Sequence, residues 1–325
     1  MRKEYGNMKY LRLIWFISFL SLLLFSGCQV DTQETDLIPA EMPDDIAQIQ
    51  QLIVGQMSGK YLLGDNTRMK SRWSREERLK AKDYLKELLF QLNIQPHENQ
   101  YVSSNLNPAI DLILEPFRGA NVYGILPSTA ISNEYVVLGA HYDTGKRGAP
   151  GAIDNATGIA LIYSVIKELS ELERRTKNVV IVFFDQEEEE LIGSKAFVNF
   201  LKNQDWNIHS VHCFDMVGWD GDGDRAMETF SASAELRELY REKALDHQIP
   251  LQEKVIDPVG YAVSSTDFDA FVPHGFNVIG AGECFYGRDS TPYKDSPQDT
   301  FETVDFSYLL SCTNFIKDII RDLVL

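Results

Sequence analysis

Apolar, β-branched segments alternate with helical patterns along most of the chain, and this alternation restricts the fold more than any other feature of the sequence. Strand-like runs occur at residues 121–126, 135–140, 178–184, 209–214 and 277–281. Strands that are separated by helices predict a largely parallel sheet with helices on both faces. We therefore expect a single α/β domain, which we place at residues 44–325.

Helical patterns occupy residues 44–57, 74–92 and 155–169. Ser74 and Glu77 have the spacing of a capping box at the start of the second helix. The third helix has one apolar face, made up of Ile162, Val165, Ile166 and Leu169. Such a face predicts that this helix packs on the sheet.

The first residues have the pattern of an export signal. An apolar run at residues 13–25, short for a membrane-spanning helix, follows the basic residues Arg2, Lys3, Lys9 and Arg12. Ser26-Gly27-Cys28 comes next and resembles the lipobox of bacterial lipoproteins, which implies cleavage before Cys28 and a lipid on its thiol. An ordinary signal peptide or an uncleaved anchor is the alternative.

These readings all place the domain outside the cytoplasm. We expect a leader at residues 1–27 and a lipidated Cys28 with a polar, flexible linker at residues 28–43. The expected location is the cell envelope, with the chain anchored by lipid to a bacterial membrane.

Charge and cysteine content limit the partners and the type of site. The formal net charge of −17 argues against nucleic acid as a partner, because phosphate binding requires clustered lysines and arginines. Cys213, Cys284 and Cys312 are an odd number of thiols after Cys28, so they cannot all pair within the chain. No CxxC pair is present, which argues against a thiolate zinc site.

Histidine or carboxylate side chains follow several of the predicted strands and the loops beside them. They are His141, Asp154, the acidic run 187–190 and Asp215. Each has an ordinary explanation by itself, as a polar loop residue, a helix cap or a solvated first turn. In open α/β sheets, however, ligands bind beyond the carboxyl ends of the strands. Together these residues therefore predict one site.

Imidazole and carboxylate groups suit zinc, and a carboxylate such as that of Asp154 can bridge two ions. We expect His141 and Asp215 to hold one zinc ion and Glu188 to hold a second, with Asp154 binding both. Adjacent side chains diverge, so Glu187 and Glu188 can have different roles.

Two further roles follow from this assignment. Glu187 is the expected general base, which takes a proton from the attacking water and passes it to the leaving nitrogen. Asp143 is placed to accept the second ring N–H of His141 and so to fix its tautomer.

The motifs HYD, DNATG, EE followed by LIGS, and FDMVG resemble those of the co-catalytic zinc aminopeptidases of clan MH. Aminopeptidase Y and bacterial leucyl aminopeptidase typify this family, which also contains glutaminyl cyclases. The resemblance extends from about His141 to the C-terminus, with weaker similarity back to Gly64. It implies a phosphorylase/hydrolase-like fold, the ligands and base assigned above, and a cis peptide bond between Asp154 and Asn155.

One position departs from the family pattern. A segment like PYYHTPxDT supplies the family's final histidine ligand, whereas residues 291–300 read TPYKDSPQDT, with Asp295 in its place. Aspartate has a shorter reach and adds negative charge, which weakens the metal as a Lewis acid. A carboxylate site also suits manganese or magnesium. We expect two zinc ions, the second of which depends on Asp295.

The expected function is hydrolysis of N-terminal residues from peptides, with one metal activating water and the other gripping the free amine. One alternative is a glutaminyl cyclase-like acyltransferase, although Asp295 alters the zinc site that a cyclase needs. Another is a peptide-binding lipoprotein with weakened catalysis, although a binder has no need of Glu187. Carboxypeptidases with an inserted dimerisation domain need more room than the gap from Asp143 to Asp154 provides.

Overall fold

The computed structural model describes residues 42–102, 118–259 and 265–325. The expected leader, the lipidated Cys28 and nearly all of the expected linker lie outside these ranges, and they stay predictions. Within the described ranges, none of the helices has the length and apolar character that crossing a membrane requires.

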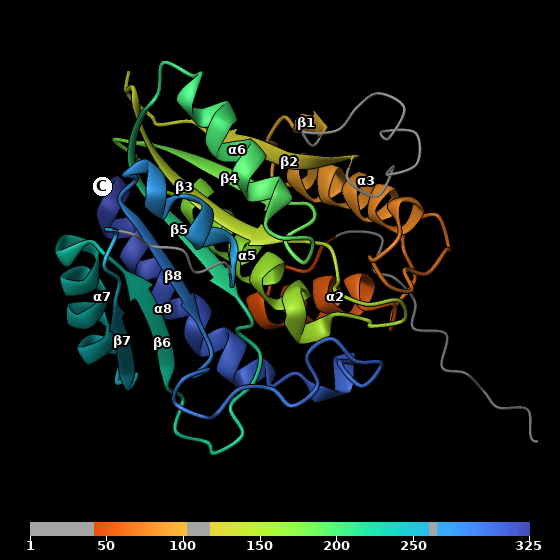
Figure 1. Ribbon diagram of the computed structural model, residues 1–325. Helices are drawn as coiled ribbons and strands as arrows, with labels where there is room; N and C mark the ends of the chain where they lie inside the picture. Colours follow the sequence, from red (N-terminus) through yellow and green to blue (C-terminus); the bar gives the residue numbers. More distant parts are fainter. Residues whose placement is uncertain (1–41, 103–117, 260–264) are drawn as a thin grey trace, which may run out of the picture. The chain divides into compact units, whose positions relative to one another are not determined.

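A single eight-stranded mixed sheet forms the centre of the domain (Figure 1). Its strands are β1 (His97–Val102), β2 (Arg118–Leu126), β3 (Glu134–His141), β4 (Asn178–Phe184), β5 (Asn207–Asp215), β6 (Met227–Ser231), β7 (Leu251–Val255) and β8 (Val278–Gly282). They are ordered β1-β2-β4-β3-β5-β8-β6-β7. The four middle strands, β4, β3, β5 and β8, are parallel. Antiparallel pairs join β1 to β2, β2 to β4 and β6 to β8.

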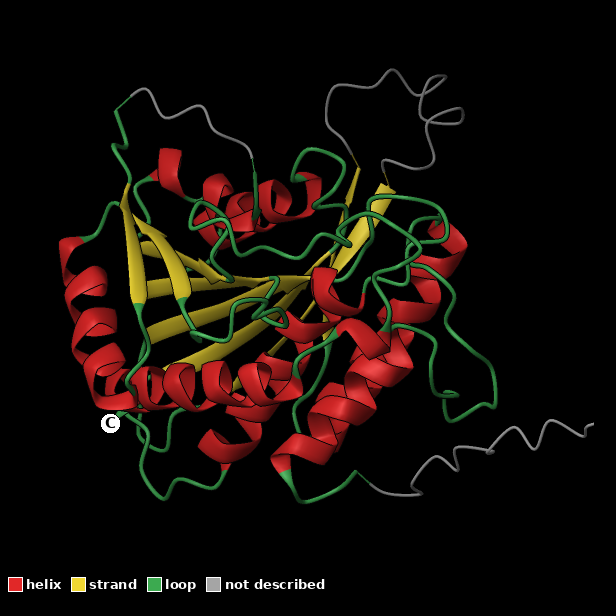
Figure 2. Ribbon diagram, turned by 90° about the horizontal axis from the view of Figure 1, so that it is seen from below, coloured by secondary structure: helices red, strands yellow, loops and turns green. Residues whose placement is uncertain are grey.

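Helices cover both faces of this sheet (Figure 2). They are α2 (Ile46–Met57), α3 (Arg75–Gln91), α5 (Thr157–Ser170), α6 (Ile192–Lys202), α7 (Ala234–His247) and α8 (Phe306–Val324). The larger core joins one face of the sheet to α2, α3, α5, α7 and α8, and the smaller core joins the other face to α6 and the turns at 267–274. The expected α/β architecture is therefore confirmed.

Strand β4 shows why the sheet is buried on both faces. Its residues Val179, Ile181 and Phe183 belong to the larger core, whereas the alternate residues Val180, Val182 and Phe184 belong to the smaller core. Side chains on a strand point alternately to opposite faces, so a central strand that is covered by helices on both sides is apolar throughout.

The predicted helix signals are also present. The Ser74 hydroxyl accepts a hydrogen bond from the backbone N–H of Glu77, and the Glu77 carboxylate accepts one from the backbone N–H of Ser74. These two bonds complete the capping box of α3. The predicted apolar face of α5 is fully buried. This helix begins at Thr157 rather than at Asn155, because Asp154 and Asn155 have non-helical backbone angles.

Three strands were not expected from the sequence, namely β1, β6 and β7. The strand β7 reads LQEKV and has no buried residue, and β1 reads HENQYV and is partly or fully exposed throughout. Both lie at the ends of the sheet, where no second layer requires a run of apolar residues. The thiols of Cys213, Cys284 and Cys312 are buried and free, as the odd number suggested.

Candidate metal centre

Three of the candidate ligands and the candidate base lie at or just after the ends of three neighbouring parallel strands. His141 is the last residue of β3, Asp215 is the last residue of β5, and Glu187 and Glu188 lie in the turn after β4. Because β4, β3 and β5 are adjacent in the sheet, their carboxyl ends deliver these side chains to one place.

The imidazole of His141 faces two of the expected ligands. Its Nε2 atom lies 3.1 Å from Oδ1 of Asp154 and 3.3 Å from Oδ1 of Asp215. Ligand atoms about 2.0–2.2 Å from a zinc ion lie about 3.3 Å from one another in a tetrahedral site. The imidazole nitrogen is therefore spaced from both carboxylates as ligands of one zinc ion are.

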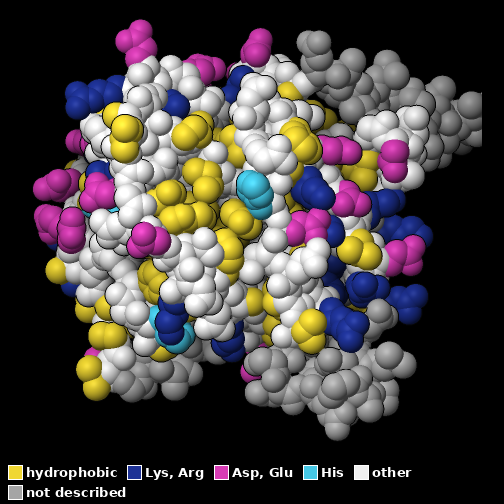
Figure 3. Space-filling model, turned by 90° about the horizontal axis from the view of Figure 1, so that it is seen from above, with side chains coloured by type: hydrophobic (Ala, Val, Ile, Leu, Met, Phe, Trp, Pro, Cys, Tyr) yellow, Lys and Arg dark blue, Asp and Glu magenta, His cyan; other side chains and the backbone are white. Residues whose placement is uncertain are grey.

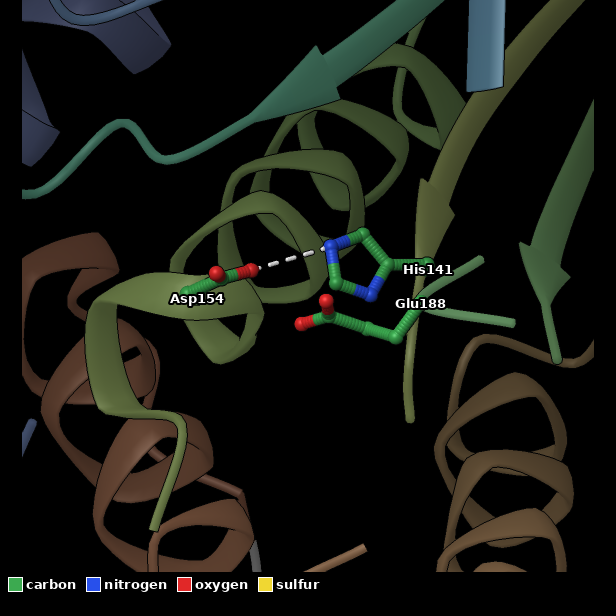
Figure 4. A group of neighbouring side chains, drawn as sticks. All are labelled: His141, Asp154 and Glu188. Atoms are coloured by element: carbon green, nitrogen blue, oxygen red, sulfur yellow. Dashed lines mark ion pairs between the residues drawn. The ribbon is translucent and has the colours of Figure 1, made fainter. Parts of the chain in front are cut away.

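Glu188 joins His141, Asp154 and Asp215 in one cluster of side chains. Ligand atoms of His141, Asp154 and Glu188 all lie within 4.8 Å of one another. Figure 4 shows the carboxylates of Asp154 and Glu188 pointing to the same side of the imidazole ring. The structure thus brings together the histidine and the carboxylates that the sequence assigned to the metal.

Several polar atoms of this cluster are buried with no hydrogen-bond partner among the described residues. They are both carboxylate oxygens of Asp154, which have only ion-pair contacts with His141 and Lys294, and Oδ1 of Asp295 and Nδ1 of His141. A buried polar atom without a partner is costly unless something else binds it. An oxygen and nitrogen donor set of this kind fits a zinc ion.

The charges in the cluster also favour a cation. Burial, followed by the negative charge of Asp154, raises the pKa of Glu188 to about 8. Burial raises the pKa of Glu187 well above its ordinary value, and Asp215 adds to this effect. Burial lowers the pKa of His141, but Glu187 and Asp215 outweigh it and leave that pKa raised. A divalent ion relieves such repulsion between carboxylates.

Asp143 approaches His141 and also holds the turn that contains Glu187 and Glu188. Its carboxylate accepts the backbone N–H groups of Glu187, at 3.0 Å, and Glu188, at 3.3 Å. Its distance to Nδ1 of His141 is 3.4 Å, which is long for a hydrogen bond. The role of Asp143 in fixing the histidine tautomer stays a prediction, and its contact with the turn is the closer one.

Asp295 reaches the edge of the cluster. Its backbone is left-handed, with φ 57°, and its Oδ1 atom is buried beside the Glu188 carboxylate. A side chain at Gly145 would collide with both carboxylates, so this glycine provides the space in which they meet. Lys146 lies 3.9 Å from the outer oxygen of Asp295. Ligation by Asp295 stays a prediction.

Asp154 is held by residues that the sequence did not single out. Asp299 accepts the backbone N–H groups of Ile153, at 2.8 Å, and Asp154, at 3.1 Å. The peptide bond between Asp154 and Asn155 is cis, as the family resemblance implied. The amide oxygen of Asn155 accepts the backbone N–H of Gly158, which connects this turn to the start of α5.

Arg72 fastens the loop that leads to Asp154. The guanidinium is fully buried and donates hydrogen bonds of 2.6–2.9 Å to the carbonyl groups of Tyr142, Met57, Pro150 and Gly151. Burial lowers the pKa of Arg72 to about 10, so the side chain stays charged at neutral pH.

Two other side chains near the cluster were missed. The ammonium of Lys294 lies 3.7 Å from Oδ2 of Asp154, and the charge of this carboxylate raises the pKa of Lys294. Glu283 is buried immediately after β8 and accepts hydrogen bonds from Ser290 and from the Thr291 amide. The strand-end rule could have found Glu283, because residues 277–281 were predicted as a strand.

The two aspartates of the SSTDFDAF segment, whose roles the sequence left open, differ in their surroundings. Asp269 accepts hydrogen bonds from the amide groups of Ser265 and Thr266, and so forms a capping box with Thr266 at the start of the turn Asp267–Ala270. Asp267 is buried, and burial raises its pKa to about 8 despite the charge of His141. Asp267 thus belongs to the surroundings of the cluster, and Asp269 is structural.

A cavity of about 150 Å³ opens beside the cluster. Asp215, Lys294 and Glu283 line it on the polar side. Its apolar wall includes Phe230, Phe268, Phe285 and Tyr286. A larger cavity, of about 370 Å³, contains none of the candidate ligands. Its lining combines basic residues of α3 and Arg118 of β2 with the acidic residues Glu98 and Asp185. In Figure 3, lysine and arginine side chains lie among acidic ones on the side that carries α3 in Figure 1.

A second acidic group brings together Asp220 and Asp222, from the loop after β5, and Asp289, from the loop after β8. The Asp289 carboxylate accepts N–H groups from Gly221 and from the Trp219 indole. These hydrogen bonds account for the position of Asp289, which stabilises the loop that contains Trp219 and Gly221.

Two sequence comparisons relate this chain to known peptidases. A family model described as peptidase family M28 matches residues 121–320. A protein described as a probable leucine aminopeptidase, from Trichophyton verrucosum, is 25% identical over 216 residues. That match covers 62% of this chain and 56% of the relative, so the chain spans little more than half of the relative's length.

Solved structures share the fold. A zinc aminopeptidase from Bacillus subtilis is similar with a TM-score of 0.69 at 13% identity, covering 87% of this chain and 96% of that protein. A glutaminyl cyclase from Bacteroides thetaiotaomicron is similar with a TM-score of 0.65 at 13% identity, covering 87% of this chain and 99% of that protein. The family resemblance expected from the motifs is thereby confirmed. Since the matched residues include every candidate ligand and well over half of the sequence, the chain belongs to peptidase family M28.

Proposed function

We propose that this protein is a metal-dependent aminopeptidase that removes N-terminal residues from peptides. The observation that carries the proposal is the position of Glu187, a buried carboxylate beside a cluster that fits zinc. His141, Asp154, Glu188 and Asp215 would hold the metal. A bound zinc ion supplies a Lewis acid that polarises the scissile carbonyl and lowers the pKa of water.

The protein's own side chains supply the proton transfer. Glu187 would accept the proton of the attacking water and deliver it to the leaving nitrogen. The Asp143 carboxylate would keep this turn in position through the two backbone N–H groups that it accepts. Burial of Glu187 keeps bulk water from competing for that proton.

The adjoining cavity supports cleavage at a free N-terminus. Oε2 of Glu283 is buried, lies at the cavity and has no hydrogen-bond partner in the part of the chain that the structure describes. A substrate ammonium group would pair with it. The aromatic wall formed by Phe230, Phe268 and Tyr286 suits an apolar N-terminal side chain.

A paired assay tests this function. The full chain should release nitroaniline from leucyl p-nitroanilide but not from its N-acetylated form, because acetylation removes the ammonium group. A chelator should abolish the release, and added zinc should restore it. Equal cleavage of the acetylated compound, or cleavage that resists the chelator, would contradict the proposal. The shared fold with a glutaminyl cyclase makes one further arm useful: ammonia release from a glutamine-leading peptide would favour the cyclase alternative.

We also propose that the enzyme acts in the cell envelope, attached through a lipid on Cys28. This part rests on the leader pattern and the Ser26-Gly27-Cys28 sequence alone. Replacing Cys28 with alanine should move the protein out of the membrane fraction in cell fractionation, and a variant that stays in that fraction would contradict the lipid anchor.

A further inference from the structure

The ammonium group of Lys294 reaches the carboxylate cluster from a side chain that is only partly exposed. Its Nζ atom is 3.7 Å from Oδ2 of Asp154, whose side chain is 3% exposed. The other oxygen of the same carboxylate, Oδ1, lies 3.1 Å from Nε2 of His141. The carboxylate that was expected to bridge two metal ions therefore has the metal-binding histidine on one oxygen and a lysine on the other.

The position of Lys294 differs from that of the neighbouring cation. Lys146 is 68% exposed and reaches only the outer oxygen of Asp295, whereas the Lys294 side chain is 36% exposed and also lines the cavity beside Asp215. Lys294 immediately precedes Asp295, which replaces the expected histidine ligand. Two changes thus occur together on the side of Asp154 where a second ion would bind.

A lysine ammonium and a divalent ion cannot share one carboxylate oxygen without strong repulsion. Two charges a few ångströms apart interact strongly when they are partly buried, because solvent then screens them much less than at the surface. A lysine also needs no ligand set, because its charge is fixed to the chain and its three N–H groups can each donate to an oxygen.

We propose that the ammonium of Lys294 takes the place of the second metal ion, so that the centre binds one divalent ion. His141 and Oδ1 of Asp154 hold that ion, with Asp215 and Glu188 within reach. The inference rests on the proposed function only in assuming that the cluster binds a metal, and it replaces the expectation of two zinc ions.

Metal stoichiometry tests the inference without substrate. The full chain, purified without chelators and dialysed against micromolar zinc, should contain one zinc per chain by elemental analysis. Lys294→Met should contain two, and calorimetric titration should show the second equivalent binding at least about tenfold more tightly than in the wild type. Lys294→Arg keeps the charge and should stay at one. Lys294→Gln serves as a second charge deletion if the methionine variant does not fold.

Lys254→Met is the matched control. Lys254 is 42% exposed and lies 3.5 Å from the fully buried Glu228, so it resembles Lys294 but contacts no candidate metal ligand. Its zinc content should equal that of the wild type. Two zinc ions in the wild type, or an unchanged single zinc in the charge-deleted variants, would overturn the inference. A one-zinc protein that fails the peptide assay would instead remove the proposed function and leave this inference standing.

Discussion

Replacing Glu187 with glutamine should lower kcat by about 10²–10⁴-fold while zinc content stays at the wild-type level. The amide cannot accept a proton, yet it has nearly the same shape, and Glu187 is outside the compact group of His141, Asp154 and Glu188. The backbone N–H of Glu187 would still bond to Asp143, so the turn should keep its structure.

Glu190→Gln is the matched control, because it makes the same change at an exposed position of the same acidic run. It should leave kcat within a factor of about two, as surface substitutions usually do. Measuring turnover and zinc content on both variants separates a role in proton transfer from a role in metal binding. Undiminished turnover by a folded Glu187→Gln protein would remove the proposed mechanism.

Replacing Arg72 with methionine should lower the free energy of unfolding by about 4 kcal/mol or more, since a buried polar group that loses its partner costs about 1–3 kcal/mol. The substitution leaves four buried carbonyl groups without the guanidinium, those of Met57, Tyr142, Pro150 and Gly151. Zinc content should fall as well, because two of these carbonyls lie in the loop that leads to Asp154.

Arg68→Met provides the comparison. Arg68 also donates to backbone carbonyl groups, those of Gly59 and Lys60, but it is exposed, and its loss should cost at most about 0.5 kcal/mol. Urea denaturation of both variants measures the difference. A loss below about 1 kcal/mol for Arg72→Met would show that water or a rearranged loop satisfies these carbonyls.

The sequence predicted the parts of the fold that depend on local patterns. The strand at 178–184 agrees with the structure at both ends, because its apolar run continues until Asp185. Ser74 and Glu77 located the start of α3 through a motif only four residues long. The edge strands β1 and β7 were missed because exposed strands need no apolar pattern.

The residues of the site also divide into those that a local sequence pattern marks and those that it does not. His141, Glu187, Glu188 and Asp215 could be found because His141 and Asp215 follow an apolar run directly and the two glutamates follow one within four residues. Arg72, Asp299 and Lys294 could not be found in this way. Arg72 bonds to carbonyl groups 70 or more residues away, and carbonyl groups leave no mark in the sequence. Lys294 has an unremarkable loop context, and only the fold shows that its ammonium reaches Asp154.

The delivery of the ligands by three adjacent parallel strands has a kinetic consequence. His141 and Asp215 lie 74 residues apart, so their meeting requires β3 and β5 to be paired already. Parallel pairing of this kind closes long loops and tends to form late in folding. A zinc ion that binds only after this pairing stabilises the native state and not the transition state before it. Zinc should therefore lengthen the lifetime of the folded protein without shortening the time that the chain needs to fold.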